Sequence, residues 1–291
     1  MNAALFGNPF DPEFFPAMKT ILEKLNESGA RVWLLKSFKV FLGSRMPDLV
    51  KDCSEFEGRE SIPPKLDFLL SIGGDGTFLE AAALTRGLDI PLVGINSGRL
   101  GFLAYISREN VVQSMEHIFN RNYRIEERSL IEMSSSDGAI NDVALNEIAI
   151  QKTDSKLITI HLYLDGELLN SYWADGLIIA TPTGSTAYSL SVGGPIVTPG
   201  SENFIISPIS PHTLAVRPVV IPNTHDIRLK IDGRTSEYIA SVDYRSYHLD
   251  STVEVNLKKS KETVKMLKLS GYSYYGTIRE KLMWGIDKRN W

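Results

Sequence analysis

The stretch LDFLLSIGGDGTFLEAAALTRG, residues 66–87, decides the fold class of this chain. It begins with a continuous apolar run, Leu66 to Ile72, which is typical of a strand that is buried on both faces. A glycine turn and a helical pattern from Thr77 to Arg86 follow this run directly. A buried strand that leads through glycines into a helix predicts a parallel α/β sheet.

Short strands and helical patterns alternate on both sides of this stretch, up to about residue 128. The triplet Asp11-Pro12-Glu13 is typical of a helix start, with an acidic N-cap and proline at the first helical position. Ser107 is expected to cap a second helix, whereas residues 37–64 show no clear pattern. Further strands are expected at 3–6, 32–35 and 90–95, and helices from Asp11 towards Gly29 and after Ser107 to Phe119.

After Arg128 the pattern changes to short strands and turn signals, which predicts an all-β domain made of two packed sheets. Asp165-Gly166 is a hairpin turn signal between two apolar stretches. A helical pattern returns at 278–284 and is expected to dock on the first domain. We therefore expect one domain at 1–128 with 270–291 and a second at 129–269. Strands of the second domain are expected at 158–164, 168–173, 176–180, 226–231, 238–242, 253–257 and 264–267.

The composition is that of an ordinary globular protein of 291 residues, with 43% hydrophobic and 23% charged residues. A net charge of −4 argues against nucleic-acid binding, because proteins that bind phosphate backbones usually carry a basic surplus. The single cysteine, Cys53, excludes an intramolecular disulfide. The start of the chain lacks a secretory pattern and no apolar run approaches the ~18 residues of a membrane span, so we expect a cytoplasmic protein with no membrane partner.

Two glycine-rich segments follow neighbouring strands of the predicted parallel sheet. Gly73-Gly74-Asp75-Gly76-Thr77 can bring backbone amides close to a phosphate at a helix N-terminus, although it is neither a Walker A loop nor a G-x-G-x-x-G motif. The simpler alternative is a tight turn in which Asp75 is only the helix N-cap. NSGRLGFL, residues 96–103, is expected either to close over the same cleft or to be a crossover turn with Phe102 in the core.

Polar residues in the second half suggest a binding site for a sugar and a ring. Asn146-Glu147 pairs a carboxamide with a carboxylate, which together can hydrogen-bond a sugar diol, although the dipeptide by itself favours a capped turn. Asp175-Gly176 is followed by TPTGSTAYSLSVGGP at 181–195. This segment is rich in Thr, Ser and Gly, whose hydroxyl and backbone N–H groups can donate hydrogen bonds. Tyr188 can pack against a ring and keep its hydroxyl in water. The five histidines lie apart without metal-ligand spacing, and no G-x-S-x-G motif or Cys–His pair supports covalent hydrolysis.

Together these segments, in order and spacing over about residues 65–245, resemble the NAD kinase family, as does PISPHTLAVRP at 208–218. The resemblance implies a Rossmann-like α/β N-terminal domain and an all-β, sandwich-like C-terminal domain, as in the diacylglycerol kinase superfamily. It also implies transfer of a phosphoryl group from ATP to the 2′-hydroxyl of the adenosine ribose of NAD⁺, with Mg²⁺ arriving on the ATP. By the same resemblance the chain is expected to form a homotetramer or homodimer through its β domain. Apolar residues on both faces of the strands around 158–180 agree with such an interface.

The resemblance also assigns roles to individual residues. Asp75 would be the general base, and the loop of Gly73, Gly74, Gly76 and Thr77 would hold the ATP phosphates. The expected NAD-binding residues are Asp75, Gly76, Phe102, Asn146, Glu147, Asp175, Thr186, Ala187, Tyr188, Ser189, Leu190, Ser191 and Arg245. Trp173 and Ala174 stand where many family members have a basic residue before the aspartate. No protein ligand of a metal is predicted.

Two other functions remain open at this point. A lipid kinase of the diacylglycerol type shares the GGDGT segment but should lack TPTGSTAY. A regulatory NAD(P)-binding protein needs no general base, whereas Asp75 stands in an intact loop.

Overall fold

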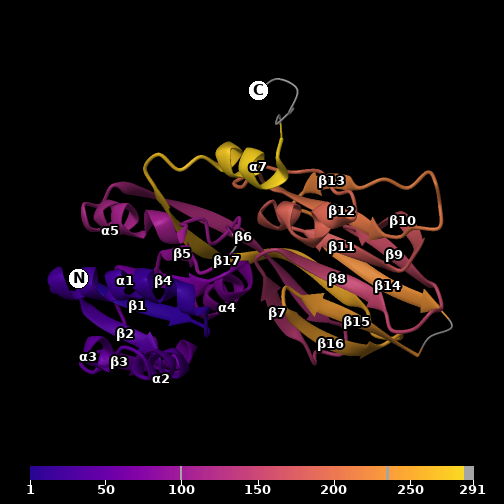
Figure 1. Cartoon of the computed structure of the whole chain (residues 1–291). Coiled ribbons are helices and arrows are strands. Elements are labelled where there is room, and N and C mark those ends of the chain that lie inside the picture. The colour runs from indigo at the N-terminus through magenta and orange to yellow at the C-terminus, as the bar shows by residue number, and fades with distance from the viewer. Residues whose placement is uncertain (99, 234–235, 285–291) are drawn as a thin grey trace. The chain divides into compact units, whose positions relative to one another are not determined.

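The computed structural model describes residues 1–98, 100–233 and 236–284, and Arg99 of the NSGRLGFL segment therefore lies outside the described residues. The chain divides into two compact units (Figure 1). Unit 1 comprises Met1–Glu126 together with the described residues from Lys265 on, and unit 2 comprises the described residues of Glu127–Val264.

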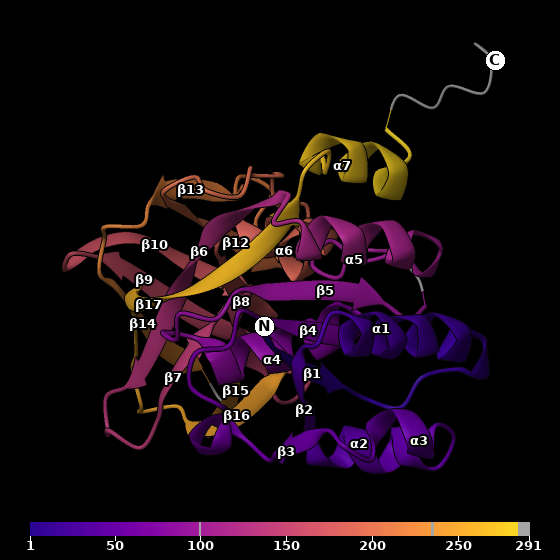
Figure 2. The same cartoon turned by 90° about the vertical axis from the view of Figure 1, so that its left-hand side faces the viewer.

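Unit 1 is built on a parallel sheet with the strand order β3-β2-β1-β4-β5, and the end of β17 pairs with β5 through Met266 and Leu92. All six residues of β4 are buried, as expected for a strand covered on both faces. Helices α1 and α5 pack against each other, which both views show (Figures 1 and 2). The elements of unit 1 are β1 (Asn2–Gly7), the short helix η1 (Pro12–Phe14), α1 (Phe15–Glu27), β2 (Arg31–Leu35), α2 (Lys36–Gly43), α3 (Pro47–Val50), β3 (Ser54–Phe56), η2 (Arg59–Ser61), β4 (Phe68–Gly73), α4 (Asp75–Thr85), β5 (Leu92–Asn96), η3 (Arg108–Asn110), α5 (Val111–Phe119) and α7 (Tyr274–Leu282).

Unit 2 contains antiparallel strands in two packed sheets. One sheet has the order β13-β12-β11-β8-β15-β16, and the other has the order β10-β9-β14-β17. Ile150 and Ile179 of the first sheet share one hydrophobic core with Ile160 and Leu229 of the second, which confirms the predicted sandwich. The elements are β6 (Tyr123–Ser135), which begins in unit 1, β7 (Asn141–Ala144), β8 (Glu147–Lys152), β9 (Ile158–Leu164), β10 (Glu167–Ala174), β11 (Gly176–Ala180), η4 (Thr183–Thr186), α6 (Tyr188–Ser191), β12 (Asn203–Ile209), β13 (Val219–Pro222), β14 (Ile227–Gly233), β15 (Glu237–Val242), β16 (Arg245–Asp250) and β17 (Val255–Leu269).

Three expectations about the secondary structure were wrong. The two strands expected at 253–257 and 264–267 are one strand, β17, because pairing continues through the polar residues between them. Asp11 and Ser107 precede helices as expected, but neither side chain makes a capping hydrogen bond. The last helix begins at Tyr274 rather than Ile278, because the Ser273 hydroxyl accepts the N–H of Gly276 at 3.1 Å and starts the helix earlier.

The end of β17 is fastened to unit 1 by the side chain of Tyr105. Its hydroxyl donates to the carbonyl of Leu267 and accepts the N–H of Leu269, both at 3.0 Å. The buried ammonium of Lys268 lies 4.2 Å from the ring centroid of Tyr105 and 4.3 Å from that of Tyr272. These contacts place the start of the C-terminal segment on the α/β unit.

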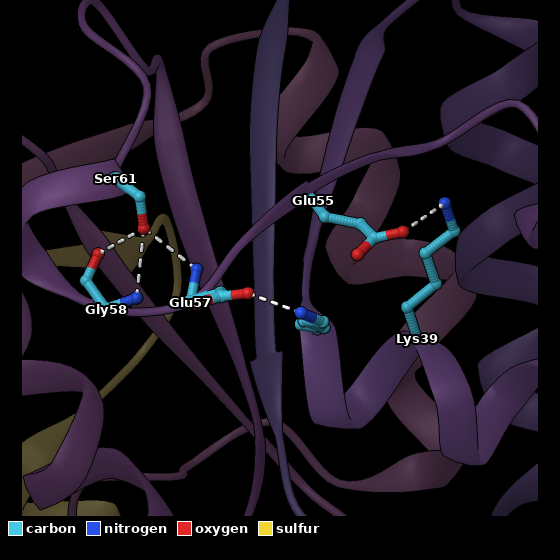
Figure 3. A network of polar contacts seen from close by, with 6 residues as sticks. Lys39, Glu55, Glu57, Gly58 and Ser61 are labelled. Atoms are coloured by element: carbon cyan, nitrogen blue, oxygen red, sulfur yellow. Dashed lines mark hydrogen bonds and ion pairs between the residues drawn. The ribbon is translucent and has the colours of Figure 1, made fainter.

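The sheet edge of unit 1 at β3 carries charged side chains (Figure 3). Lys39 of α2 donates to Glu55 at 3.1 Å and to the carbonyl of Cys53 at 2.7 Å. The hydroxyl of Ser61 accepts the N–H groups of Glu57 and Gly58. Such a short, charged edge strand resists pairing with other chains. Within the described residues, no helix combines the length and the apolar character needed to span a membrane.

Candidate active site

The carboxylate of Asp75 is held by the loop that follows β5. Its Oδ2 accepts the N–H of Phe102 at 2.8 Å, and its Oδ1 accepts those of Leu103 and Ala104 at 3.0 and 2.9 Å. The two glycine-rich segments of unit 1 thus meet at this side chain. A carboxylate offers about four acceptor positions, so three amide donors leave about one free for a ligand.

Gly101 makes this arrangement possible. A Cβ atom at this position would overlap Oδ1 of Asp75 and lie 2.6 Å from its Cγ. The absence of a side chain lets the loop approach the carboxylate closely enough for three consecutive amides to donate to it.

Asp75 is not the N-cap of its helix, because Gly74 occupies that position and Asp75 is the first residue of α4. The alternative explanation of Asp75 as a simple cap is therefore wrong. Gly73 ends β4, and a Cβ on it would lie 2.7 Å from Cβ of Thr77, so the turn folds tightly back on the first turn of α4. Gly76 stands next to Asp75, where a Cβ would meet nothing within 4 Å.

Phe102 is half-buried and contacts the C-terminal helix. The ammonium of Lys281 on α7 lies 4.4 Å from the centroid of the Phe102 ring, a cation–π contact within unit 1. The expected crossover turn with Phe102 in the core is therefore only partly realised, since the ring keeps an accessible face.

In unit 2 the Asn146-Glu147 dipeptide lies in a tightly held turn that leads into β8, whose first residue is Glu147. Asp243 accepts the N–H groups of Leu145, Asn146 and Glu147 at 2.8, 2.8 and 3.2 Å. The N–H of Asp243 donates in return to the carbonyl of Glu147 at 3.0 Å. Asp243 has a φ of 51°, a left-handed conformation that aspartate tolerates better than most residues.

The TPTGST segment packs directly on this turn. The N–H of Thr181 donates to the carbonyl of Asn146 at 2.8 Å, and its hydroxyl donates to the carbonyl of Leu145 at 2.6 Å. A Cβ on Gly184 would overlap the Asn146 carbonyl, so this position also requires glycine. The structure thus brings together two segments that are more than thirty residues apart in the sequence.

Asp175 lies at the other end of the same strand pair. Gly176 pairs with Gln151 and Ala180 pairs with Glu147, so Asp175 and Glu147 are separated by about 13 Å or more of strand. Asp175 forms an ion pair with the ammonium of Lys152 at 2.5 Å. A lysine from β8 therefore lies next to this carboxylate.

Tyr188 connects the two ends of this strand pair. Its backbone hydrogen-bonds to the carboxyl of Glu147, and its hydroxyl accepts Nε2 of Gln151 at 3.3 Å. The side chain is 36% exposed, so its ring is available to a ligand. Thr186, Ala187 and Leu190 are half-buried around it, and Ser191 is exposed.

Two of the expected NAD-binding residues use their side chains for hydrogen bonds to other residues of unit 2. Ser189 is fully buried, and its hydroxyl hydrogen-bonds to that of Ser207 at 3.1 Å. The guanidinium of Arg245 donates to Asp142 at 2.6 Å and to the carbonyl of Val143 at 2.8 Å. Their contribution to ligand binding stays a prediction.

Electrostatics single out Glu147. Its Oε2 is buried and has no hydrogen-bond partner among the described residues. Burial, and after it the negative charge of Asp243, raise the pKa of Glu147 to about 8, although the hydrogen bond from the Tyr188 backbone acts in the opposite direction. Burial raises the pKa of Asp243 as well, but its three amide donors favour the charged form. Glu147 is therefore the carboxyl of this pair with fewer hydrogen-bond donors to stabilise its charged form.

Sequence patterns did not reveal Asp243, Lys152 or Lys281 as parts of these sites, nor the close approach of Gly101 to Asp75. The only available signal for Asp243 was its position in a short segment between two expected strands, which indicates a turn and no more. In the described part of the chain, no group of three or more His, Cys, Asp or Glu side chains is arranged to hold a metal ion.

Comparison with known proteins identifies the family. Models of the ATP-NAD kinase N-terminal and C-terminal domains match residues 4–123 and 145–269. The NAD kinase of Cytophaga hutchinsonii is 43% identical over 293 residues, which cover all of both chains. The chain belongs to the NAD kinase family. The NAD kinase of Bacteroides fragilis is 39% identical over 99% of this chain and 100% of its own.

Solved structures of NAD kinases share the fold. The crystal structure of an NAD kinase from Archaeoglobus fulgidus in complex with ATP matches 97% of this chain and 99% of its own, with a TM-score of 0.76 and 27% identity. Yeast NADH kinase complexed with NADH matches 99% of this chain and 88% of its own, with a TM-score of 0.86 and 24% identity. The second likeness concerns the fold alone.

Proposed function

We infer that the chain transfers the terminal phosphoryl group of ATP to the 2′-hydroxyl of the adenosine ribose of NAD⁺, which gives NADP⁺ and ADP. The observation that carries this inference is the full-length identity to NAD kinases, with the GGDGT segment intact. A lipid kinase or a regulatory NAD(P)-binding protein is not favoured, because the relatives that match over the whole length are NAD kinases.

Asp75 is proposed to accept the proton of the attacking hydroxyl. An alcohol is a weak nucleophile at neutral pH, so a positioned carboxylate that takes its proton lowers the barrier. The amides of Phe102, Leu103 and Ala104 fix the direction of the carboxylate and leave an acceptor position for the hydroxyl. The neighbouring glycine turn at 73–77 leads into a helix N-terminus, where backbone N–H groups can donate hydrogen bonds to the phosphates of ATP.

Residues of unit 2 are proposed to bind the dinucleotide. Asn146 and Glu147 would hold the ribose and base of the adenosine, and Tyr188 would pack against the ligand. Asp175, held by Lys152, lies a strand length away from Glu147 and would therefore contact a different part of an extended ligand.

Mg²⁺ is proposed to enter with the substrate as MgATP. This ion usually keeps several waters and binds through substrate phosphates, so it needs no cage of protein ligands.

The function is tested by incubating the protein with NAD⁺ or NADH, each with MgATP or polyphosphate. NADP⁺ formed from NAD⁺ and ATP is the expected product, and the other three combinations define donor and acceptor preference. Tight NADP⁺ binding without turnover, or phosphorylation of a lipid extract in preference to NAD⁺, would contradict the proposal.

A homotetramer or homodimer formed through unit 2 is proposed as the assembled state. Strand β10 is the first strand in the order of its sheet, and it exposes Leu168, Leu169 and Trp173 to 50%, 41% and 55%. Large apolar side chains exposed on a strand at the edge of a sheet are a liability unless a partner covers them. Light scattering at micromolar concentration is expected to give at least twice the 32.4 kDa mass of one chain, and a monomer mass would contradict the proposal.

A further inference from the structure

Two half-buried carboxyl groups of unit 2 lie at the same turn, but Asp243 accepts three backbone amides whereas Glu147 accepts one, that of Tyr188. Asp243 accepts three consecutive amides of the turn at 145–147. Glu147, at the end of this turn, has one buried carboxyl oxygen without a partner among the described residues. A buried acceptor that lacks a donor is costly, and the cost is greatest when the group is charged.

The surroundings of Glu147 leave it as the protonated member of the pair. The negative charge of Asp243 acts against ionisation of Glu147, so of these two carboxyls the one with fewer donors keeps the proton. The charged and titratable groups that face the pair are Arg245 on β16, which acts on Asp243, and beyond it Asp142 and Tyr247, which hydrogen-bond to each other at 2.8 Å. Arg245 itself is engaged by Asp142, so it does not neutralise Glu147.

The ligand proposed for this turn brings the donors that Glu147 lacks. A ribose diol has two adjacent hydroxyl groups, and a carboxylate accepts hydrogen bonds from such donors more strongly than a neutral acid does. Binding the sugar therefore favours the ionised form of Glu147.

We propose that Glu147 holds a proton in the free protein and releases it when the adenosine ribose of NAD⁺ binds, and that Asp243 is the positioning residue that both shapes the turn and keeps this proton on Glu147. The proposal rests on the proposed function, since it takes the NAD⁺ ribose as the ligand of this turn. It makes the release of one proton part of NAD⁺ binding, and the affinity for NAD⁺ therefore depends on pH.

The sign of the linkage follows from the proton balance. Below pH 8 the free protein must give up a proton to bind, so the affinity for NAD⁺ rises by up to about tenfold per pH unit. Above pH 8 Glu147 is already ionised in the free protein, and the affinity levels off. At pH 7 about one proton is released for each NAD⁺ bound.

The test is calorimetry of NAD⁺ binding without ATP, from pH 6 to pH 9. At pH 7 the titration is repeated in buffers with different ionisation enthalpies, so that the slope gives the number of protons released. Glu147→Gln should bind NAD⁺ with an affinity that does not change with pH and without proton release. An unchanged pH dependence in this variant would overturn the proposal.

Asp243→Asn separates the proposed role from a structural one. Removal of the neighbouring negative charge should shift the rise in affinity to lower pH, whereas a loss of turn structure alone would weaken binding by the same factor at every pH. Asp165→Asn is the matched control, because Asp165 also has a positive φ, 49°, and also accepts a backbone amide, that of Asp226 at 2.9 Å. The control should behave as the unmodified protein does.

The outcomes distinguish this proposal from the kinase function. A protein that forms NADP⁺ but binds NAD⁺ with a pH-independent affinity and no proton release would overturn the proposal and leave the function intact. A protein that binds no NAD⁺ would overturn both. If Asp243→Asn does not fold, the unmodified protein and Glu147→Gln still decide whether the proton is released.

Discussion

Asp75→Asn is expected to lower kcat by about 10²–10⁴-fold while the affinity for NAD⁺ changes little. The factor is the usual contribution of a positioned general base, which an amide cannot replace because it does not accept the hydroxyl proton. An unchanged KM would show that the lost interaction is made only in the transition state.

The same substitution is expected to destabilise unit 1. Three amides donate to the two oxygens of Asp75, whereas asparagine has one oxygen and would turn an NH₂ group towards the remaining amide. Loss of a hydrogen bond to a charged acceptor predicts a decrease of about 1.5–3 kcal/mol in the free energy of unfolding. Asp75 therefore has a structural role that a simple N-cap would not have, since asparagine caps helices as well as aspartate does.

Steady-state kinetics, calorimetry of NAD⁺ binding and urea unfolding test both effects on one variant. Asp89→Asn is the control, because Asp89 forms an ion pair with Lys265 in the same unit and its side chain is 87% exposed. Such an exposed pair contributes about 0–1 kcal/mol, so activity and stability should be nearly unchanged. Turnover of Asp75→Asn at the unmodified rate would refute the catalytic assignment, and loss of NAD⁺ binding would make Asp75 a binding residue instead.

Patterns with a clear physical cause were read correctly from the sequence. The run that became β4 was predicted because a strand covered on both faces must be apolar throughout. The sandwich of unit 2 was predicted from short strands with turn signals between them. The sequence did not predict helices α2 and α3 or strand β3. Residues 37–64 combine charged positions with an edge strand of three residues, and their hydrophobic residues therefore follow no regular period.

Many residues of the candidate sites were predicted from the sequence, but the hydrogen bonds between the segments that carry them were not. The carboxyl ends of neighbouring parallel strands meet at one edge of a sheet, so the segments after β4 and β5 were expected to share a cleft. That three amides of one segment would hold Asp75 of the other depends on the loop backbone, which has no pattern in the sequence. Asp243 and Glu147 are 96 residues apart, and nothing in either segment indicates that the turns meet.

Gly101→Ala is expected to abolish most of the activity without changing any residue that contacts substrate. The new methyl group would overlap Oδ1 of Asp75 and lie 2.6 Å from its Cγ, so either the loop or the carboxylate must move. Either movement breaks the hydrogen bonds from Phe102, Leu103 and Ala104 that fix the proposed base. A misplacement of about 1 Å costs about 10²-fold in rate, so kcat should fall at least that far.

Gly98→Ala is the matched control in the same loop. A Cβ on Gly98 would meet nothing within 4 Å, whereas one on Gly101 would collide with Asp75. The control should therefore keep its kcat, and Gly101→Ala should also lose about 1–3 kcal/mol of stability through overpacking. Equal activity of the two alanine variants would show that displacement of Asp75 does not affect turnover. The hydrogen bonds from Phe102, Leu103 and Ala104 to Asp75 would then have no part in catalysis. A low kcat in Gly101→Ala alone, with NAD⁺ binding retained, would place the effect at the carboxylate, because the two variants add the same methyl group three residues apart.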